Sequence, residues 1–330
     1  MNMDFLDRVG LEHPVVQAGM GGGVAGAELA GAVSAAGALG TIGMMPAAVL
    51  GAQVVRARER AEGRPVAANL LVPFTRAGHV QACIDARPAL VVFHGGLGRR
   101  WFAALREANV LVFSTVGTLA QAKAALDAGA DGLVVQGVEA GGHLMGDQPL
   151  PTLLPRVREL GDFPVLAAGG IGRAADVRAV LDAGADAAVA GTRFLLTNES
   201  RAHPVYKQRV LTATRTVRTM LFGIGWPLEH RVVPNAATER WTGPTGELPA
   251  WLRQLERASA PMARILPLRA GSVMASIQRT RMPLFGPALP LAGMPDSVVE
   301  TTALYAGETA LDIDDVIPAA EAVARLTGTT

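Results

Sequence analysis

The residues best suited to chemistry lie in one run, Gln136-Gly137-Val138-Glu139-Ala140-Gly141-Gly142-His143. A histidine after two glycines sits on flexible backbone, and its imidazole titrates close to neutral pH. Such a side chain can abstract a proton from a substrate or stabilise an anion. A histidine can also be purely structural, but the glycine-rich loop favours a catalytic role for His143. His94 is a second histidine that could contact a substrate.

Two glycine-containing turns could hold a phosphate group. Ala168-Gly169-Gly170-Ile171 and Gly191-Thr192 each follow a short apolar run. Glycine removes the side chains that would block phosphate oxygens, so backbone N–H groups can donate to them, and the Thr192 hydroxyl is a further donor. A plain turn would explain either segment alone, but the pair favours a phosphate site. Asn69 ends another apolar run and could donate to a cofactor or simply satisfy its own loop.

Other cofactor and catalytic motifs are incomplete or missing from the sequence. Gly21-Gly22-Gly23-Val24-Ala25-Gly26 formally matches GxGxxG, but no acidic residue stands near Gly40–Gly43, where a dinucleotide-binding fold needs one. The six histidines are scattered without metal-ligand spacing, and no serine-nucleophile or P-loop motif occurs. The sequence therefore predicts neither a Rossmann site nor a metal centre.

Short apolar runs that would place these residues recur along the first 200 residues, most of them starting about 20 to 27 residues apart. The predicted strands are Val15–Ala18, Leu39–Ile42, Val66–Leu70, Ala89–Phe93, Val110–Thr115, Gly132–Gln136, Val165–Ala168 and Ala187–Ala190. The Ala-rich segments predicted as helices are Ala27–Ala36, Ala47–Glu62, Arg99–Ala108, Leu119–Ala128 and Ala174–Ala183. Eight such units can close into a (β/α)8 barrel, with the active site at the carboxyl ends of the strands. An open doubly wound sheet is the alternative, although it needs only five or six strands.

The strand–helix rhythm stops after Arg201. Residues 205–298 contain helical patterns such as Trp251–Ser259 and a proline-rich stretch, and the final segment Asp315–Leu326 is amphipathic. We therefore predict an α/β protein: a TIM barrel formed by residues 1–204 and completed by 299–330. Residues 205–298 are predicted to form a small inserted, mainly helical domain that acts as a lid over the substrate.

Composition excludes several classes of protein. The 30 basic and 29 acidic residues are spread along the chain without a basic block, so nucleic acid is not an expected partner. A single cysteine, Cys83, rules out an internal disulfide and fits a reducing compartment. The N-terminal segment Met1–Gly10 lacks the apolar stretch of a signal peptide, and glycines interrupt the weakly charged stretch Pro14–Val55. We expect a cytoplasmic protein without a membrane partner.

These segments resemble, in type and order, those of the nitronate monooxygenases, also called 2-nitropropane dioxygenases. The resemblance is carried by Gln17-Ala18-Gly19-Met20, Asn69, the Gln136–His143 run, Ala168–Ile171, Gly191-Thr192-Arg193-Phe194, His203-Pro204-Val205-Tyr206-Lys207 and Leu304-Tyr305-Ala306-Gly307-Glu308. It spans nearly the whole chain. The wider superfamily of FMN-binding barrels also includes an enoyl-ACP reductase and NADH:quinone reductases.

The resemblance implies a bound FMN and assigns residues to it. Ala18, Gly19 and Met20 would line the isoalloxazine ring, and Asn69 and Gln136 would hydrogen-bond to that ring. The residues implied to hold the ribityl phosphate or to border it are Gly141, Gly142, Ala168, Gly169, Gly170, Gly191 and Thr192. His143 would face the substrate as the catalytic base. Beside these implied roles, His94 and Tyr305 are candidates for substrate contact.

This sequence departs from the family pattern at two places. Gly19 stands where the family usually has a proline, and Leu221–Pro227 replaces a segment expected to read like Ser-Gly-Arg in the lid.

The resemblance predicts an FMN-dependent monooxygenase that oxidises alkyl nitronates, or the parent nitroalkanes, with dioxygen. An NAD(P)H-dependent flavin reductase acting on an enoyl thioester or a quinone is the alternative, and no nicotinamide-binding signature decides between them. A protein that binds a flavin or another phosphate-containing ligand without catalytic activity is a third hypothesis. A homodimer is left open as the assembly.

Overall fold

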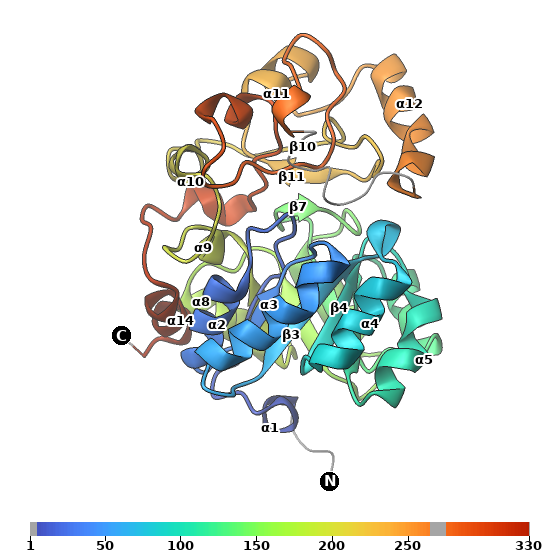
Figure 1. Ribbon diagram of the computed structural model, residues 1–330, viewed down its shortest axis with the longest axis vertical. Coiled ribbons are helices and arrows are strands. Elements are labelled where there is room, and N and C mark those ends of the chain that lie inside the picture. Colours follow the sequence, from blue (N-terminus) through green and yellow to red (C-terminus); the bar gives the residue numbers. More distant parts are fainter. Residues whose placement is uncertain (1–4, 265–274, 330) are drawn as a thin grey trace.

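The computed structural model describes residues 5–264 and 275–329. Figure 1 shows a barrel of strands surrounded by helices, below a smaller group of helices and strands. Met1–Asp4, the start of the N-terminal segment, lie outside the described residues. Across the described ranges, no helix combines the length and the apolar character needed to cross a membrane.

Eight parallel strands form the barrel, as predicted. They are β1 (Val15–Gln17), β2 (Gly40–Ile42), β3 (Val66–Leu71), β4 (Leu90–His94), β5 (Leu111–Val116), β6 (Gly132–Gln136), β8 (Val165–Ala168) and β9 (Ala187–Ala190). Their order is β1-β9-β8-β6-β5-β4-β3-β2, and a parallel bridge from Val16 to Leu39 joins the two ends. The barrel is therefore closed, and the alternative of an open sheet is excluded.

The alternation of side chains along each strand divides the core into two layers. In β4, Leu90 and Val92 point into the barrel interior, whereas Val91 and Phe93 pack beneath the surrounding helices. Both faces are thus buried, which is why these strands appear in the sequence as continuous apolar runs. Phe5 of the short helix α1 (Phe5–Val9) closes the bottom of the interior against Phe113.

The helices around the barrel are α2 (Ala27–Ala35), α3 (Ala47–Arg60), α4 (Ala77–Ala86), α5 (Arg99–Glu107), α6 (Leu119–Asp127), α7 (Leu150–Arg158) and α8 (Ala174–Asp182). The sequence pattern does not single out α4 or α7; α7 carries Pro155 inside the helix, which weakens the helical signal. The last helix, α14 (Ala319–Thr327), contacts α2 and α8. The C-terminus therefore returns to the barrel wall.

The chain after β9 is not purely helical. It contains α9 (Thr192–Leu195), α10 (Pro204–Leu211), α11 (Ala236–Trp241), α12 (Ala250–Ala258) and the short strands β10 (Val217–Thr219) and β11 (His230–Val232). The two strands form an antiparallel sheet with β7 (Gly142–His143), which lies between the barrel and the upper group in Figure 1. Three-residue strands are too short to show an alternating pattern, so the sequence did not predict them.

The division of the chain into a barrel and an inserted domain at 205–298 stays a proposal. The Asn235 side chain donates to the carbonyls of Val299 and Thr302, both at 2.8 Å. The inserted segment is thus bonded to the chain immediately after residue 298.

Candidate active site

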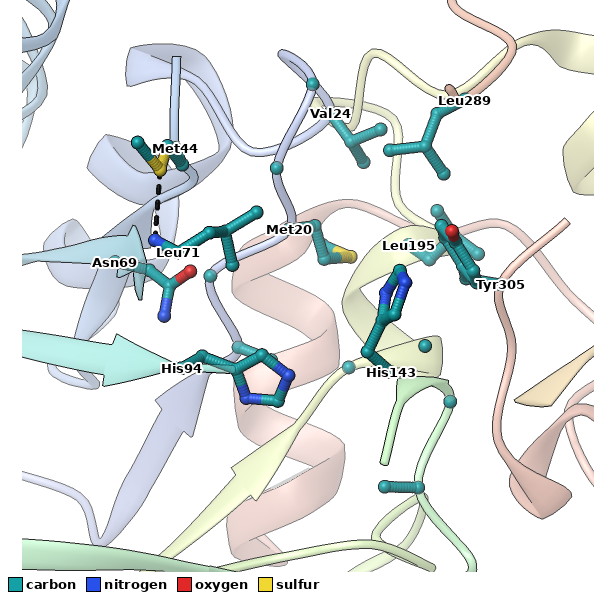
Figure 2. Close-up of a pocket in the computed structure, with 18 of the residues that line it drawn as sticks. Met20, Val24, Met44, Asn69, Leu71, His94, His143, Leu195, Leu289 and Tyr305 are labelled. Carbon is teal, nitrogen blue, oxygen red and sulfur yellow. Dashed lines mark hydrogen bonds between the residues drawn. The ribbon is translucent and has the colours of Figure 1, made fainter. Parts of the chain in front are cut away.

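A cavity of about 520 Å³ lies at the carboxyl ends of the barrel strands. Figure 2 shows His143 and Tyr305 on one side of it and Asn69 and Met44 on the other. Every residue that the sequence singled out for a site lines this cavity: Ala18, Gly19, Met20, Asn69, His94, Gln136, Gly141, Gly142, His143, Ala168, Gly169, Gly170, Gly191, Thr192 and Tyr305. Their individual roles stay predictions.

The backbone of His143 is part of a sheet, which corrects the expectation of a flexible loop. His143 pairs with His230 in β11, and the next N–H, of Leu144, donates to the Glu229 carbonyl at 2.8 Å. The Gln136 amide donates to the His143 carbonyl at 3.1 Å and accepts from the Met145 N–H at 2.8 Å. Gln136 therefore holds the histidine segment in place, whereas its predicted bond to a flavin ring is untested.

Arg231, on β11, connects this segment to the C-terminal part of the chain. Its guanidinium donates to the Val138 carbonyl at 2.7 and 3.2 Å and to the Thr216 hydroxyl at 3.0 Å. It also pairs with Glu308 at 2.9 Å, and its side chain is only 8% exposed. Arg231 thus links the turn after β6 to β11 and to Glu308.

The His143 imidazole lies among aromatic rings. It is stacked on Trp226, with ring centroids 3.6 Å apart and planes 12° apart, and it is 4.9 Å from His230 and 5.3 Å from Tyr305. Its Nε2 is buried and has no hydrogen-bond partner among the described residues. Such a nitrogen is free to exchange a proton with a bound molecule.

Burial keeps these histidines neutral. Loss of hydration lowers the pKa of His143 well below its usual value, and the nearby His230 and His94 lower it further. Burial also lowers the pKa of His94 and of His230 to about 4. His143 is therefore an uncharged imidazole at neutral pH, the form that can accept a proton.

Gly19 is explained by its neighbour Asn69. A Cβ at position 19 would lie 2.3 Å from the Asn69 Cβ, so no side chain, proline included, fits beside Asn69 as it stands. The Asn69 Nδ2 donates to the Val92 carbonyl at 3.2 Å, while its Oδ1 is buried without a partner in the described chain. The missing proline thus leaves room for an amide oxygen that can accept a hydrogen bond at the cavity wall.

The turns after β8 and β9 expose backbone donors. Gly169 and Gly170 have φ values of +117° and +72°, which favour glycine. The N–H groups of Gly169, Gly170 and Gly191 donate to no acceptor in the described ranges. The Thr192 hydroxyl oxygen accepts from the Gly307 N–H at 2.9 Å, which leaves its own proton to donate.

An anion in these turns would be held by neutral donors. Arg193, which follows Thr192 directly, is committed to Asp315 at 2.6 Å, and its side chain is 4% exposed. No lysine or arginine is among the described residues that line the cavity. The described part of the chain also contains no cluster of three His, Cys, Asp or Glu side chains that could hold a metal ion.

Sequence reasoning missed Trp226 as a site residue. It lies in the Leu221–Pro227 segment, which the sequence marks as a departure from the family but not as part of the site. A tryptophan beside a glycine and a proline carries no specific signal. Only the tertiary structure brings its ring onto His143, 83 residues away in sequence.

The rest of the wall is apolar. Val24, Leu195 and Leu289 lie near one another across the cavity from Asn69 (Figure 2). Such a wall suits a hydrocarbon part of a ligand.

Comparisons with known proteins agree with this architecture. The family model described as nitronate monooxygenase matches residues 4–81 and 55–328. A (3aS,4S,5R,7aS)-5-hydroxy-7a-methyl-1-oxo-octahydro-1H-indene-4-carboxyl-CoA dehydrogenase of Mycobacterium tuberculosis is 34% identical over 241 residues, which cover 70% of this chain and 66% of that protein. A nitronate monooxygenase of Pseudomonas aeruginosa is 32% identical over 267 residues, covering 66% of this chain and 75% of that protein. The chain thus spans just under two thirds of the length of the first of these relatives.

Solved structures are similar to this chain over nearly its full length. FabK from Thermotoga maritima has a TM-score of 0.77 at 25% identity and covers 99% of this chain and 96% of its own. The nitroalkane oxidase from Streptomyces ansochromogenes has a TM-score of 0.74 at 30% identity, with coverage of 98% and 96%. Because the family model matches the barrel strands and the inserted segment alike, this chain belongs to the nitronate monooxygenase family.

Proposed function

We propose that the cavity holds FMN. Its volume of about 520 Å³ falls within the range of cofactor sites, and the unpaired N–H groups after β8 and β9 suit a phosphate. The backbone of Gly169, Gly170, Gly191 and the Thr192 hydroxyl would hold that phosphate, while Gly141, Gly142 and Ala168 border it. Asn69 Oδ1 would accept from the ring, lined by Ala18, Gly19 and Met20. Bound FMN would take electrons from the substrate and pass them to dioxygen.

The activity that the site supports best is oxidation of alkyl nitronates, or of nitroalkanes, with dioxygen. The observation that carries this proposal is the uncharged His143, whose buried Nε2 has no partner among the described residues. A carbon next to a nitro group is acidic, so an imidazole at the cavity wall can take its proton and leave the nitronate. The names of the Pseudomonas and Streptomyces relatives support the same chemistry.

The absence of cationic side chains from the described cavity lining bears on other substrates. A coenzyme A thioester, like the substrate class named for the Mycobacterium relative, carries several phosphates, as does NADPH. Such groups are usually recognised by arginine or lysine. The lining therefore gives little support to a CoA-dependent dehydrogenase or to the NAD(P)H-dependent reductase considered from the sequence. An apolar wall instead favours a small substrate with an alkyl chain.

The test uses the purified full-length protein. We expect a flavin absorbance spectrum and oxygen uptake with the nitronate of nitropropane in the absence of NAD(P)H. Anaerobic NADPH should leave the flavin oxidised. Colourless protein that takes up no FMN removes the cofactor proposal. Rapid bleaching by NADPH, together with no oxygen uptake on any alkyl nitronate, would replace the monooxygenase by the reductase.

Location in the cytoplasm and assembly as a homodimer stay predictions.

A further inference from the structure

The Trp226 ring packs against Phe74, His94 and Gly95. Phe74 and His94 meet its ring edge-on, at 5.6 Å and 5.9 Å between ring centroids. Behind it lies Gly95, where a Cβ would come within 2.5 Å of the Trp226 Cζ2. Gly95 therefore leaves room for the indole beside the end of β4, and the His143 imidazole is stacked on that indole. The close, nearly parallel stack is built into the fold and does not depend on a mobile side chain.

Among the described residues, no carboxylate forms an ion pair with His143; Glu139 also lines the cavity, but its carboxylate accepts from the Leu150 N–H. The titratable groups that face it are His94 from β4, His230 from β11 and Tyr305 from the C-terminal segment. Glu256, on α12 near Tyr305, is fully buried, and burial raises its pKa to about 9, so it is uncharged at neutral pH.

His230 cannot take over the proton without losing its own bonds. Its Nδ1 lies 3.0 Å from the Leu228 carbonyl, and its Nε2 accepts from the Phe222 N–H at 3.4 Å. A ring nitrogen that accepts from a backbone N–H cannot also carry a proton. His230 is therefore a poor acceptor for a proton from His143, and the group in closest contact with the His143 ring is the indole face.

We propose that the Trp226 indole stabilises the protonated imidazole of His143 and is thus a positioning residue for proton abstraction. Tryptophan offers the most electron-rich face to a cation, and the attraction strengthens where water is excluded. In the step concerned, the substrate C–H bond breaks and the proton goes to His143 Nε2. The electron pair of that bond forms C=N, and the negative charge moves to the two nitro oxygens. The proposal rests on the proposed role of His143 as the base.

The test compares Trp226→Phe and Trp226→Leu, two apolar replacements that keep water out while weakening or removing the aromatic face. The pKa of His143 is measured by NMR titration of isotope-labelled histidine, with His143→Asn identifying the resonance. We expect it to fall by about one unit in Trp226→Leu and by less in Trp226→Phe. Trp251→Leu, at a tryptophan of α12 that is 54% exposed, is the matched control and should leave it unchanged.

Kinetics provide a second measurement that a merely structural role would not reproduce. Neutral nitropropane must lose a proton in the site, whereas its nitronate has already lost it. Trp226→Leu should lower kcat/KM about tenfold more for nitropropane than for the nitronate, because only nitropropane loses a proton in the site. Equal losses on both substrates would contradict the proposal. If Trp226→Leu fails to fold, Trp226→Phe gives the same comparison with a smaller expected effect.

The direction of the pKa change separates the explanations. An unchanged or raised pKa of His143 in Trp226→Leu overturns the proposal, because the indole would then act only by excluding water. A wild-type His143 that takes up no proton before the protein unfolds overturns it as well. Wild-type protein that oxidises no nitronate would remove the proposed function, while the titration would still decide the role of Trp226.

Discussion

At the level of single residues, His143 is surrounded by aromatic rings and by two other histidines. Its Nε2 faces no partner among the described residues, and the Gln136 amide fixes the backbone that carries it. On the opposite wall, the Asn69 Oδ1 has no partner in the part of the chain that the structure describes, and Asn69 fits there because Gly19 has no side chain. Glycines and amide groups, rather than charges, therefore shape this cavity.

Replacement of His143 by asparagine should lower kcat/KM for neutral nitroalkanes by about 10²- to 10⁴-fold, the usual contribution of a general base. Only the unprotonated imidazole accepts a proton, and the pKa of His143 is lowered well below 6.5 by burial and by the neighbouring histidines. The wild-type rate should therefore be level through neutral pH and decline only on the acid side. Oxygen uptake across pH checks both points. Unchanged rates in His143→Asn would remove this residue from the mechanism.

Gly170→Ala tests the proposal that the turn after β8 holds the FMN phosphate. A Cβ there would lie 3.8 Å from the Glu139 Cβ, so space is available, but the φ of +72° costs an alanine about 1–2 kcal/mol. A shift of this turn should weaken FMN binding at least tenfold, measured by fluorescence titration. Gly10→Ala is the matched control, because Gly10 has φ +79° and open space around it after α1. Equal FMN affinities in the two variants would place the phosphate elsewhere.

At the level of elements, the short strands β7, β10 and β11 form the small sheet that positions His143. Pairing of β7 with β11 attaches the histidine segment of the barrel to the chain that follows β9. Leu252 and Glu256 are the buried positions of α12, and Leu252 packs with Phe222 in one apolar cluster. Glu256 is thus a carboxyl group within an apolar interface, and neither of its oxygens has a hydrogen-bond partner in the described chain.

Glu256→Gln should stabilise the protein at alkaline pH. Burial raises the pKa of Glu256 from 4.5 to about 9, so the folded state favours the protonated form. As far as Glu256 determines it, the stability of the wild type is highest below pH 4.5, the pKa of this group in the unfolded chain. It falls as the pH rises from about 4.5 to about 9, whereas glutamine does not titrate. Thermal unfolding should show a gain of several degrees near pH 8.5 that disappears near pH 4.5. Glu239→Gln, exposed on α11, is the control, and an equal gain there would contradict the explanation.

At the level of the whole molecule, the C-terminus completes the barrel. Asp315 lies 2.6 Å from Arg193, just after β9, and 2.6 Å from Arg325 on α14. Asp315 therefore joins the buried Arg193, in the turn after β9, to the exposed Arg325 of the last helix. Val323 and Leu326 of α14 add apolar contacts to the large core cluster that contains Leu29 and Val177.

Asp315→Asn should destabilise the fold by about 2–4 kcal/mol, because the buried Arg193 loses its charged partner. Although burial alone would raise the pKa of Asp315, hydrogen bonds from Arg193 and Arg325 lower it. The contribution of ionised Asp315 to stability is therefore present above pH 3.8 and is lost as the pH falls below it. The stabilities of wild type and variant should thus converge in acid. Urea unfolding measures the difference. Asp312→Asn, in an exposed pair with Arg173, should cost less than about 1 kcal/mol; a similar cost in both variants would argue against burial as the cause.

The sequence by itself determined the barrel and the residues around its mouth. Each strand is a local apolar run, each helix a local pattern, and parallel strands bring their carboxyl ends to one edge. Glycines such as Gly169 and a strand-terminal Asn69 could therefore be assigned to one cavity without coordinates. The sequence also showed that Gly19 replaces the family proline, but it did not show that Asn69 leaves no room for a side chain there.

Only the tertiary structure decided what surrounds His143. The pairing of β7 with β11 joins His143 to His230, 87 positions apart, and strands of two and three residues give no periodic signal. The stack of Trp226 on His143, the neutral Glu256 and the ion pair of Arg193 with Asp315 likewise depend on contacts between distant segments. A local pattern shows which residues share an element, whereas burial and pKa depend on which elements meet.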